Sequence, residues 1–147
     1  MKNLQFGYLL VCLVTFLCVE YSSAQNLVYK NYSIKDGLAS TVVYYVAQDN
    51  KGFVWFGTDQ GLCRFDGTNF KTFTTQDGLP DNEVLFIRVD SQDRVWMICY
   101  NSRPCFIYNG VIHTTHNDSM LSRIGGADNL FRDIGIDKEG KVWILGS

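Results

Sequence analysis

The chain has 147 residues, of which 46% are hydrophobic and 14% aromatic, and its formal net charge is −2. This length suffices for one ordinary domain. Lys and Arg form no cluster in the sequence, which excludes the phosphate-neutralising surface that nucleic-acid binding requires, so we expect no nucleic-acid partner for this segment.

Residues 1–24 differ from the rest of the chain and predict a secretory signal peptide. Lys2 supplies a positive charge, residues 6–19 are apolar and uncharged, and Ser22-Ser23-Ala24 places small residues at a cleavage site. Cleavage before Gln25 leaves residues 25–147 as the mature chain. We expect this part to be exported to the periplasm.

Two alternatives to cleavage are less favoured by the residues themselves. The apolar run is short for a membrane span of about 20 residues, and Glu20 follows it directly, which argues against a retained anchor. A lipid on Cys18 is disfavoured because Phe16 and Leu17 stand where small residues precede a lipidated cysteine. Export without a lipid is the prediction.

The mature part is built from a repeat. Trp55, Trp96 and Trp143 each end a phrase that begins with Asp and a turn, and they are 41 and 47 positions apart. A second phrase, residues 29–38, recurs 41 positions later as residues 70–79. This period is typical of a four-stranded propeller blade and not of a helical repeat.

Alternating apolar residues between turn-formers predict the strands of these blades. Each intervening turn is short enough for an antiparallel hairpin. The expected strands are 42–48, 53–57, 62–66 and 70–74 in the first blade, 84–89, 94–98, 105–108 and 111–115 in the second, and 131–136 and 141–145 in the third.

Residues 29–38 match the fourth strand and exit of a blade, but the predicted signal peptide stands where the other strands of that blade belong. We interpret them as an orphan outer strand. Propellers close by completing one blade from both ends of the chain, and they need at least four blades. The fold class is therefore all-β: an N-terminal fragment of a propeller, forming an open arc of about two and a half four-stranded antiparallel blades plus the orphan strand.

Two stretches carry a family resemblance. Residues 52–67 read Gly-x-x-Trp-Phe-Gly-Thr-x-x-Gly-Leu-x-Arg-Phe-Asp-Gly, and residues 77–84 read Asp-Gly-Leu-Pro-x-Asn-x-Val. They resemble the two-component regulator propeller repeat, which is found in the periplasmic sensor halves of bacterial histidine kinases and hybrid two-component systems. The second repeat departs from it, with Ile98-Cys99-Tyr100-Asn101 where the first has Phe56-Gly57-Thr58.

The resemblance implies a large extracytoplasmic ligand-sensing domain of an inner-membrane protein. Its partners would be a small molecule or a glycan-derived oligosaccharide, the remaining propeller blades and the downstream sensor domains. A kinase core follows such domains in the family, and a homodimeric parent protein is expected. None of the membrane span, kinase, receiver or DNA-binding segments of the family falls within these 147 residues.

Two insertions relative to the first blade indicate a binding face. The loop after the second strand of a blade and the connection to the next blade emerge on the same face, and the second blade is longer in both places, at residues 99–104 and 117–129. Loops on one face of a rigid scaffold commonly carry binding residues. The alternative is a set of tolerated surface insertions. The candidate ligand-binding residues are Tyr100, Asn101, Arg103, Arg123, Asp128 and Asn129.

The tryptophans are expected in the core and not on a sugar-stacking platform. Trp55, Trp96 and Trp143 hold the same place in the second strand of each blade, where one side must pack between blades. The Asp turns lack the further carboxylates of a calcium loop. His113 and His116, three apart on a strand, point to opposite faces. We expect no metal site and no cofactor.

Three cysteines remain after removal of the signal peptide. Cys99 and Cys105 bracket one hairpin and can pair in an oxidising periplasm, although spacing alone does not establish the geometry. Cys63, on an alternating strand, is expected to be buried.

The favoured function is a non-catalytic sensor domain. One alternative is a secreted propeller enzyme that acts on glycans, such as a sialidase. Its Asp-boxes need Asp five residues before Trp, where this chain has Asn50, Ser91 and Lys138, and no paired carboxylates suit glycosidic cleavage. A further alternative is an adhesion or scaffold propeller without a kinase, so no catalytic residue is assigned.

Overall fold

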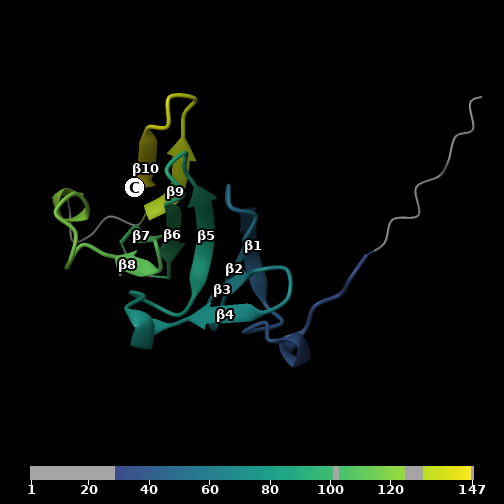
Figure 1. The fold of residues 1–147 in the computed structure, drawn as a ribbon. Coiled ribbons are helices and arrows are strands. Elements are labelled where there is room, and N and C mark those ends of the chain that lie inside the picture. Colours follow the sequence, from purple (N-terminus) through teal and green to yellow (C-terminus); the bar gives the residue numbers. More distant parts are fainter. Residues whose placement is uncertain (1–28, 101–102, 125–130, 147) are drawn as a thin grey trace, which may run out of the picture. The chain divides into compact units, whose positions relative to one another are not determined.

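The computed structural model of the chain describes residues 29–100, 103–124 and 131–146. The chain divides into two compact units, Met1–Asn31 and Tyr32–Ser147, and every described strand belongs to the second unit (Figure 1). No helix in these described ranges is long and apolar enough to span a membrane. The predicted signal peptide at 1–24 and its cleavage site before Gln25 lie outside the described residues.

The second unit contains two four-stranded antiparallel sheets and one two-stranded sheet, which confirms the all-β prediction. Blade one has the order β1-β2-β3-β4, blade two β5-β6-β7-β8, and blade three pairs β9 with β10. Each strand begins and ends within two residues of its predicted bounds. The strands are β1 Val43–Gln48, β2 Val54–Thr58, β3 Gly61–Phe65, β4 Phe70–Phe73, β5 Val84–Val89, β6 Val95–Cys99, β7 Cys105–Tyr108, β8 Val111–His113, β9 Phe131–Ile136 and β10 Val142–Gly146.

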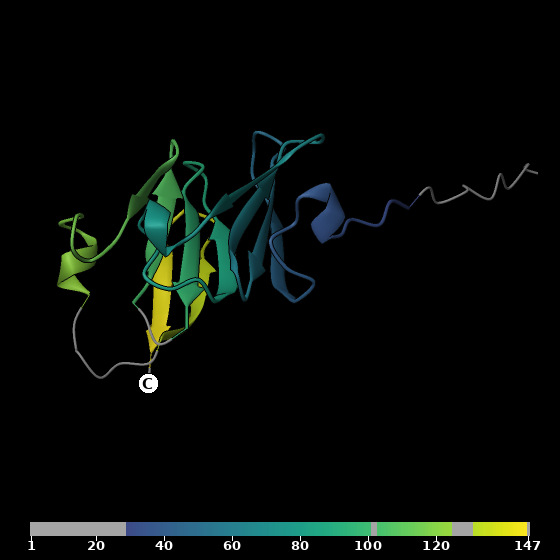
Figure 2. The ribbon, with the colours of Figure 1, turned by 90° about the horizontal axis from the view of Figure 1, so that it is seen from below.

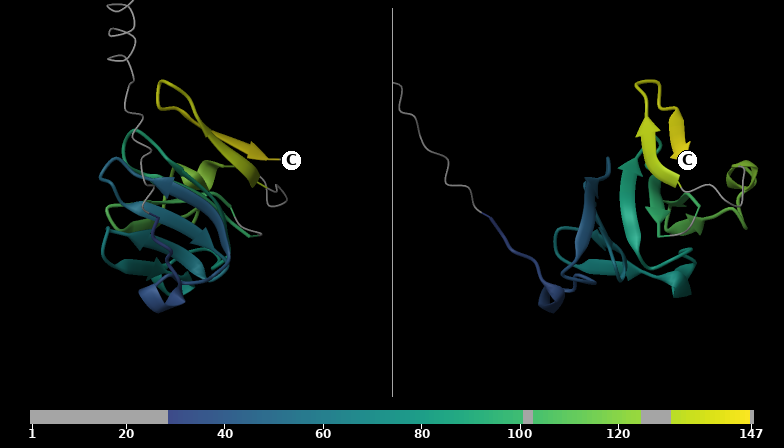
Figure 3. Two further views of the ribbon diagram at one scale, coloured as in Figure 1. Left: turned by 90° about the vertical axis from the view of Figure 1, so that its right-hand side faces the viewer. Right: turned by 180° about the vertical axis from the view of Figure 1, so that it is seen from behind.

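The first strands of the three blades are neighbours. β5 contacts β1, and β9 contacts β5, so the blades follow one another as in a propeller (Figures 2 and 3).

The segment expected to be an orphan outer strand is not a strand. Residues 29–33 lie in no ladder, whereas the matching residues Phe70–Phe73 form β4 against β3. A strand requires a neighbour that exchanges backbone hydrogen bonds with it, and no described strand pairs with residues 29–33. The likeness between the two phrases lies instead in their last six residues.

Those residues fold into the same short turn twice. In η1 (Ile34–Asp36) and η2 (Thr75–Asp77), the side-chain hydroxyl of the residue before the turn accepts the backbone N–H of the Asp that ends the turn. The side chain of that Asp accepts the backbone N–H of the residue before the turn, and the two bonds form a capping box. A glycine in the left-handed conformation ends both turns. The leucines that follow, Leu38 and Leu79, are buried, so each turn is anchored in the apolar interior.

Two apolar clusters hold the blades together. The first joins blade one to blade two and the second joins blade two to β9 and β10. The first contains Trp55, Leu62, Phe73 and Leu79 from blade one and its exit turn, with Val84, Ile87, Val95, Met97, Cys99, Cys105, Ile107 and Ile112 from blade two. The second contains Trp96, Ile98, Phe106, Leu121 and Ile134.

The core prediction holds for two of the three tryptophans. Trp55 and Trp96 are 4% and 2% exposed, but Trp143 is 52% exposed, so the prediction is wrong for Trp143 in this structure. The first two are each covered by strands of the following blade. Within the described part of the chain no strand follows β10, and Trp143 therefore has no such cover.

Each tryptophan is bound to the turn that precedes its strand. The indole Nε1 of Trp55, Trp96 and Trp143 donates to a carboxylate oxygen six residues earlier, at 2.8, 2.8 and 3.0 Å. The other carboxylate oxygen accepts two backbone N–H groups of the turn. One carboxylate thus fixes both a hairpin turn and an aromatic ring. We call this arrangement the Asp–Trp clamp; its carboxylates are those of Asp49, Asp90 and Asp137.

Gly57 allows β2 of blade one to approach β5 of blade two. A Cβ at this position would lie 2.5 Å from the carbonyl oxygen of Val84 and 3.4 Å from Cδ1 of Ile87. Because the first of these atoms belongs to the backbone, the strands would have to separate to admit a side chain.

Gly57→Ala should therefore lower the free energy of unfolding by about 2 kcal/mol through overpacking. Gly135→Ala is the matched control, since a Cβ at Gly135 in β9 meets only ordinary contact at 3.7 Å, and we expect little change. Urea unfolding measures both, and equal losses would contradict the close-approach argument.

Asp90→Ala should cost about 3 kcal/mol of unfolding free energy, because the buried Trp96 N–H and the turn amides lose their acceptor. Asp137→Ala removes the matching indole and turn-amide bonds around the half-exposed Trp143, where water can replace them, and it breaks no bond like the one from Arg94 to Asp90, so its loss should be clearly smaller. The comparison uses chemical denaturation. A larger loss for the Asp137 variant would show that burial does not set the strength of the clamp.

The clamp also predicts a pH dependence. Burial alone would raise the pKa of Asp90, but hydrogen bonds from Trp96 and Arg94 outweigh it and lower the pKa below the ordinary 3.8. The charged form therefore stabilises the fold above about pH 4, and this stability is lost as the pH falls through the lowered folded-state pKa. Thermal unfolding measured between pH 2 and pH 6 should show that the Tm falls as the pH is lowered, and Asp90→Asn should make this fall less steep.

Candidate functional site

The loops after β2 and β6 and the connections leading into β1 and β5 lie at one end of the sheets. We call this end the loop face; its described residues are 39–42, 59–60, 80–83, 100 and 103–104. The Tyr100 N–H donates to the Glu83 carbonyl oxygen at 2.8 Å, which joins the β6–β7 loop to the connection into β5. The Asp–Trp clamps are at the opposite ends of the strands, after β1, β5 and β9.

Tyr44 stands at the edge of the loop face because of an irregularity in β1. The ladder between β1 and β2 shifts register between Val43 and Tyr45, and such a bulge redirects a side chain. The Tyr44 hydroxyl donates to Glu83 Oε1 at 2.7 Å, while the residue remains 43% exposed. This bond ties the start of blade one to the connection into blade two.

Carboxylates dominate the electrostatics around Tyr44. The hydrogen bond to Glu83 is the main cause that raises the pKa of Tyr44, followed by desolvation and by the charges of Glu83 and Asp59. The Ser40 side chain, through a hydrogen bond, is the main cause that lowers the pKa of Asp59. Asp59 Oδ1 is buried and has no hydrogen-bond partner in the described ranges. A neutral phenol thus lies beside carboxylate acceptors, an arrangement suited to a ligand that donates hydrogen bonds and packs on an aromatic ring.

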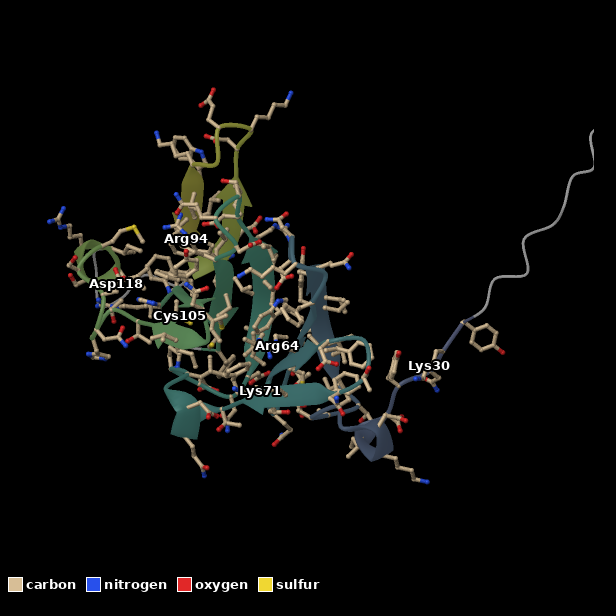
Figure 4. The ribbon with its side chains drawn as sticks, in the orientation of Figure 1. Lys30, Arg64, Lys71, Arg94, Cys105 and Asp118 are labelled. Atoms are coloured by element: carbon tan, nitrogen blue, oxygen red, sulfur yellow. The ribbon has the colours of Figure 1, made fainter. Side chains whose placement is uncertain are left out.

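The structure brings together only some of the residues expected from the sequence. Tyr100 is half-exposed on the loop face, and Arg103 is partly buried in the same loop. Arg123 ends η3 (Leu121–Arg123), which follows Asp118 on the side of blade two remote from β1 (Figure 4). Asn101, Asp128 and Asn129 lie outside the described residues.

Sequence reasoning missed Tyr44, Asp59 and Glu83. It selected insertions, whereas these residues lie in segments of ordinary length. The rule that loops after second strands share a face with the connections between blades would have included residues 59–60 and 80–83. The run of six apolar residues at 42–47 breaks the alternation expected of a strand and is the signal for the bulge at Tyr44.

His113 ends β8, the outer strand of blade two, whereas His116 lies in the turn after it, so the expectation that both lie on a strand is wrong for His116. His113 stacks on Phe106 with ring centroids 4.5 Å apart, and its Nδ1 lies 3.2 Å from Asp118 Oδ2. Among the residues that the structure describes, no group of three or more His, Cys, Asp or Glu side chains could hold a metal ion.

Known proteins resemble this chain in sequence and in fold. A stretch of 74 residues is 36% identical to histidine kinase P4 of Formosa agariphila and covers 50% of this chain and 5% of that protein. The solved extracellular domain assigned to a hybrid two component system of B. thetaiotaomicron has a TM-score of 0.64 at 23% identity, over 78% of this chain and 17% of that one.

The chain therefore spans a small part of both proteins, and the structural likeness establishes a propeller fold. The family model of the two component regulator propeller matches residues 37–60. This range runs from the end of η1 through β1 and β2 and overlaps the predicted stretch 52–67 at residues 52–60, so the chain contains a segment that matches the two component regulator propeller repeat.

Proposed function

We propose that this chain is part of the exported, non-catalytic ligand-sensing propeller of a two-component sensor. The observation that carries the proposal is the family repeat at residues 37–60 within consecutive four-stranded blades. The apolar residues 6–19 with Ser22-Ser23-Ala24 support export to the periplasm. The parent protein would be a membrane-anchored homodimer whose kinase responds to ligand binding on the propeller.

The ligand site is the loop face around Tyr44, Glu83 and Tyr100. Two tyrosines that are 43% and 50% exposed offer aromatic surface. Glu83 and Asp59 offer carboxylate oxygens that accept hydrogen bonds from hydroxyl groups. A short oligosaccharide derived from a glycan presents both an apolar ring face and hydroxyl donors, and it is the ligand class that this chemistry favours.

A paired substitution tests the proposal. Tyr44→Ala with Tyr100→Ala in the full-length protein should weaken binding of short oligosaccharides about tenfold or more, because each exposed ring supplies contact area and few core contacts. Titration calorimetry against a panel of neutral and acidic oligosaccharides measures the effect, and melting curves check the fold.

Thr68→Ala with Lys138→Ala is the control pair, since both residues lie in exposed turns away from the loop face. Binding should be unchanged in this variant. Loss of binding there, with retention in the tyrosine variant, would place the site on the opposite face. If neither pair alters binding, the Tyr44–Tyr100 cluster is not the site.

A further inference from the structure

The β2–β3 and β6–β7 hairpins of blades one and two can be compared at two equivalent positions, one of which differs. In blade one Phe56 pairs with Cys63, and in blade two Met97 pairs with Cys105. Two residues beyond Phe56 and Met97, at the entrance to each loop, blade one has Thr58 and blade two has Cys99. Blade two therefore carries two cysteines where blade one carries a threonine and a cysteine.

The threonine secures the short loop of blade one. Thr58 is fully buried, its hydroxyl donates to the Gly61 carbonyl at 2.8 Å, and it accepts the Gln60 N–H. The loop of blade two, residues 100–104, is longer than residues 59–60 and begins after a cysteine, which cannot reproduce so strong a pair of hydrogen bonds.

Cys99 and Cys105 are 1% and 0% exposed and belong to one apolar cluster, and Cys105 lies in the interior of blade two (Figure 4). A hydrogen bond with Cys99, together with burial, raises the pKa of the Cys105 thiol. The β6–β7 ladder ends at the pair Met97–Cys105, and Cys99, two residues further along β6, remains paired with Val84 of β5.

Cys63 has a different environment. Its sulfur accepts the Ala39 N–H at 3.2 Å and lies 3.3 Å from the Thr72 hydroxyl. These contacts hold Cys63 within blade one, so we expect it to remain a thiol.

We propose that Cys99 and Cys105 form a disulfide that staples the β6–β7 loop when the protein folds in an oxidising compartment. The two thiols lose two protons and two electrons to the disulfide of a protein oxidoreductase, which becomes a dithiol. Because both cysteines are buried in the folded blade, the exchange takes place before the blade closes, and the finished bond is shielded from reductants. The staple keeps Tyr100 next to Glu83. This inference rests on the export in the proposed function.

Peptide mapping tests the bond directly. Full-length protein is refolded with a glutathione redox couple, alkylated under denaturing conditions and digested with trypsin. Residues 95–123 form one tryptic peptide, because Arg103 precedes Pro104, and it contains both cysteines; residues 52–64 contain Cys63. We expect the first peptide to carry no alkyl group and to weigh two hydrogens less, and the second to be alkylated. Two alkyl groups on the first peptide, or a cross-link to Cys63, would overturn the proposal.

Thermal unfolding gives an independent readout. Wild type and Cys63→Ser refolded in a reductant should have a Tm about 5 °C below that of the same proteins refolded with the redox couple, whereas Cys99→Ser/Cys105→Ser should show no difference. An equal fall in all three proteins would refute the staple. Refolding in vitro tests the disulfide whatever compartment the protein occupies in the cell, so export is tested separately by cell fractionation. A protein that is found in the cytoplasm but still forms the bond on refolding would contradict the proposed function and not the disulfide.

Discussion

The Asp–Trp clamp is the interaction on which each blade depends. An indole placed between two sheets buries a large apolar surface, but it also buries an N–H group that must find an acceptor. The charge of the carboxylate that accepts it is stabilised by hydrogen bonds from the amides of the turn, so a single Asp makes burial of the ring compatible with a tight hairpin. The clamp is local in sequence, whereas the apolar contacts that it positions join different blades.

Much of the fold could be predicted because its signals are local and repeated. Turn-formers and alternation located the strands from β1 to β10 to within two residues, and the tryptophan period identified the blades. The clamp was not foreseen, although the Asp six residues before each Trp is visible in the sequence. Strand alternation indicates on which face of the sheet a side chain lies, but it does not indicate which acceptor a polar group of that side chain binds.

The errors arose where a local phrase was taken to imply a distant partner. Residues 29–33 resemble an outer strand in sequence, but strand formation depends on a neighbour that these residues lack in the described structure. Trp143 shares its phrase with Trp55 and Trp96, yet burial comes from the following blade and not from the phrase. The loop face was predicted from insertions, and its described cluster at Tyr44 and Glu83 depends on a bulge and on a contact between residues 39 positions apart.

The bulge at Tyr44 has a counterpart in blade two, where the β5–β6 ladder shifts register between Val84 and Phe86 and so leaves Leu85 in the same place. The residue at a bulge is outside the ladder, and its replacement leaves the paired strands and the apolar clusters intact. Blades one and two thus each contribute to the loop face one position that lies outside the ladder, tyrosine in one blade and leucine in the next. In the proposed loop-face site, single substitutions at these positions would change the ligand preference of a blade without changing its paired strands.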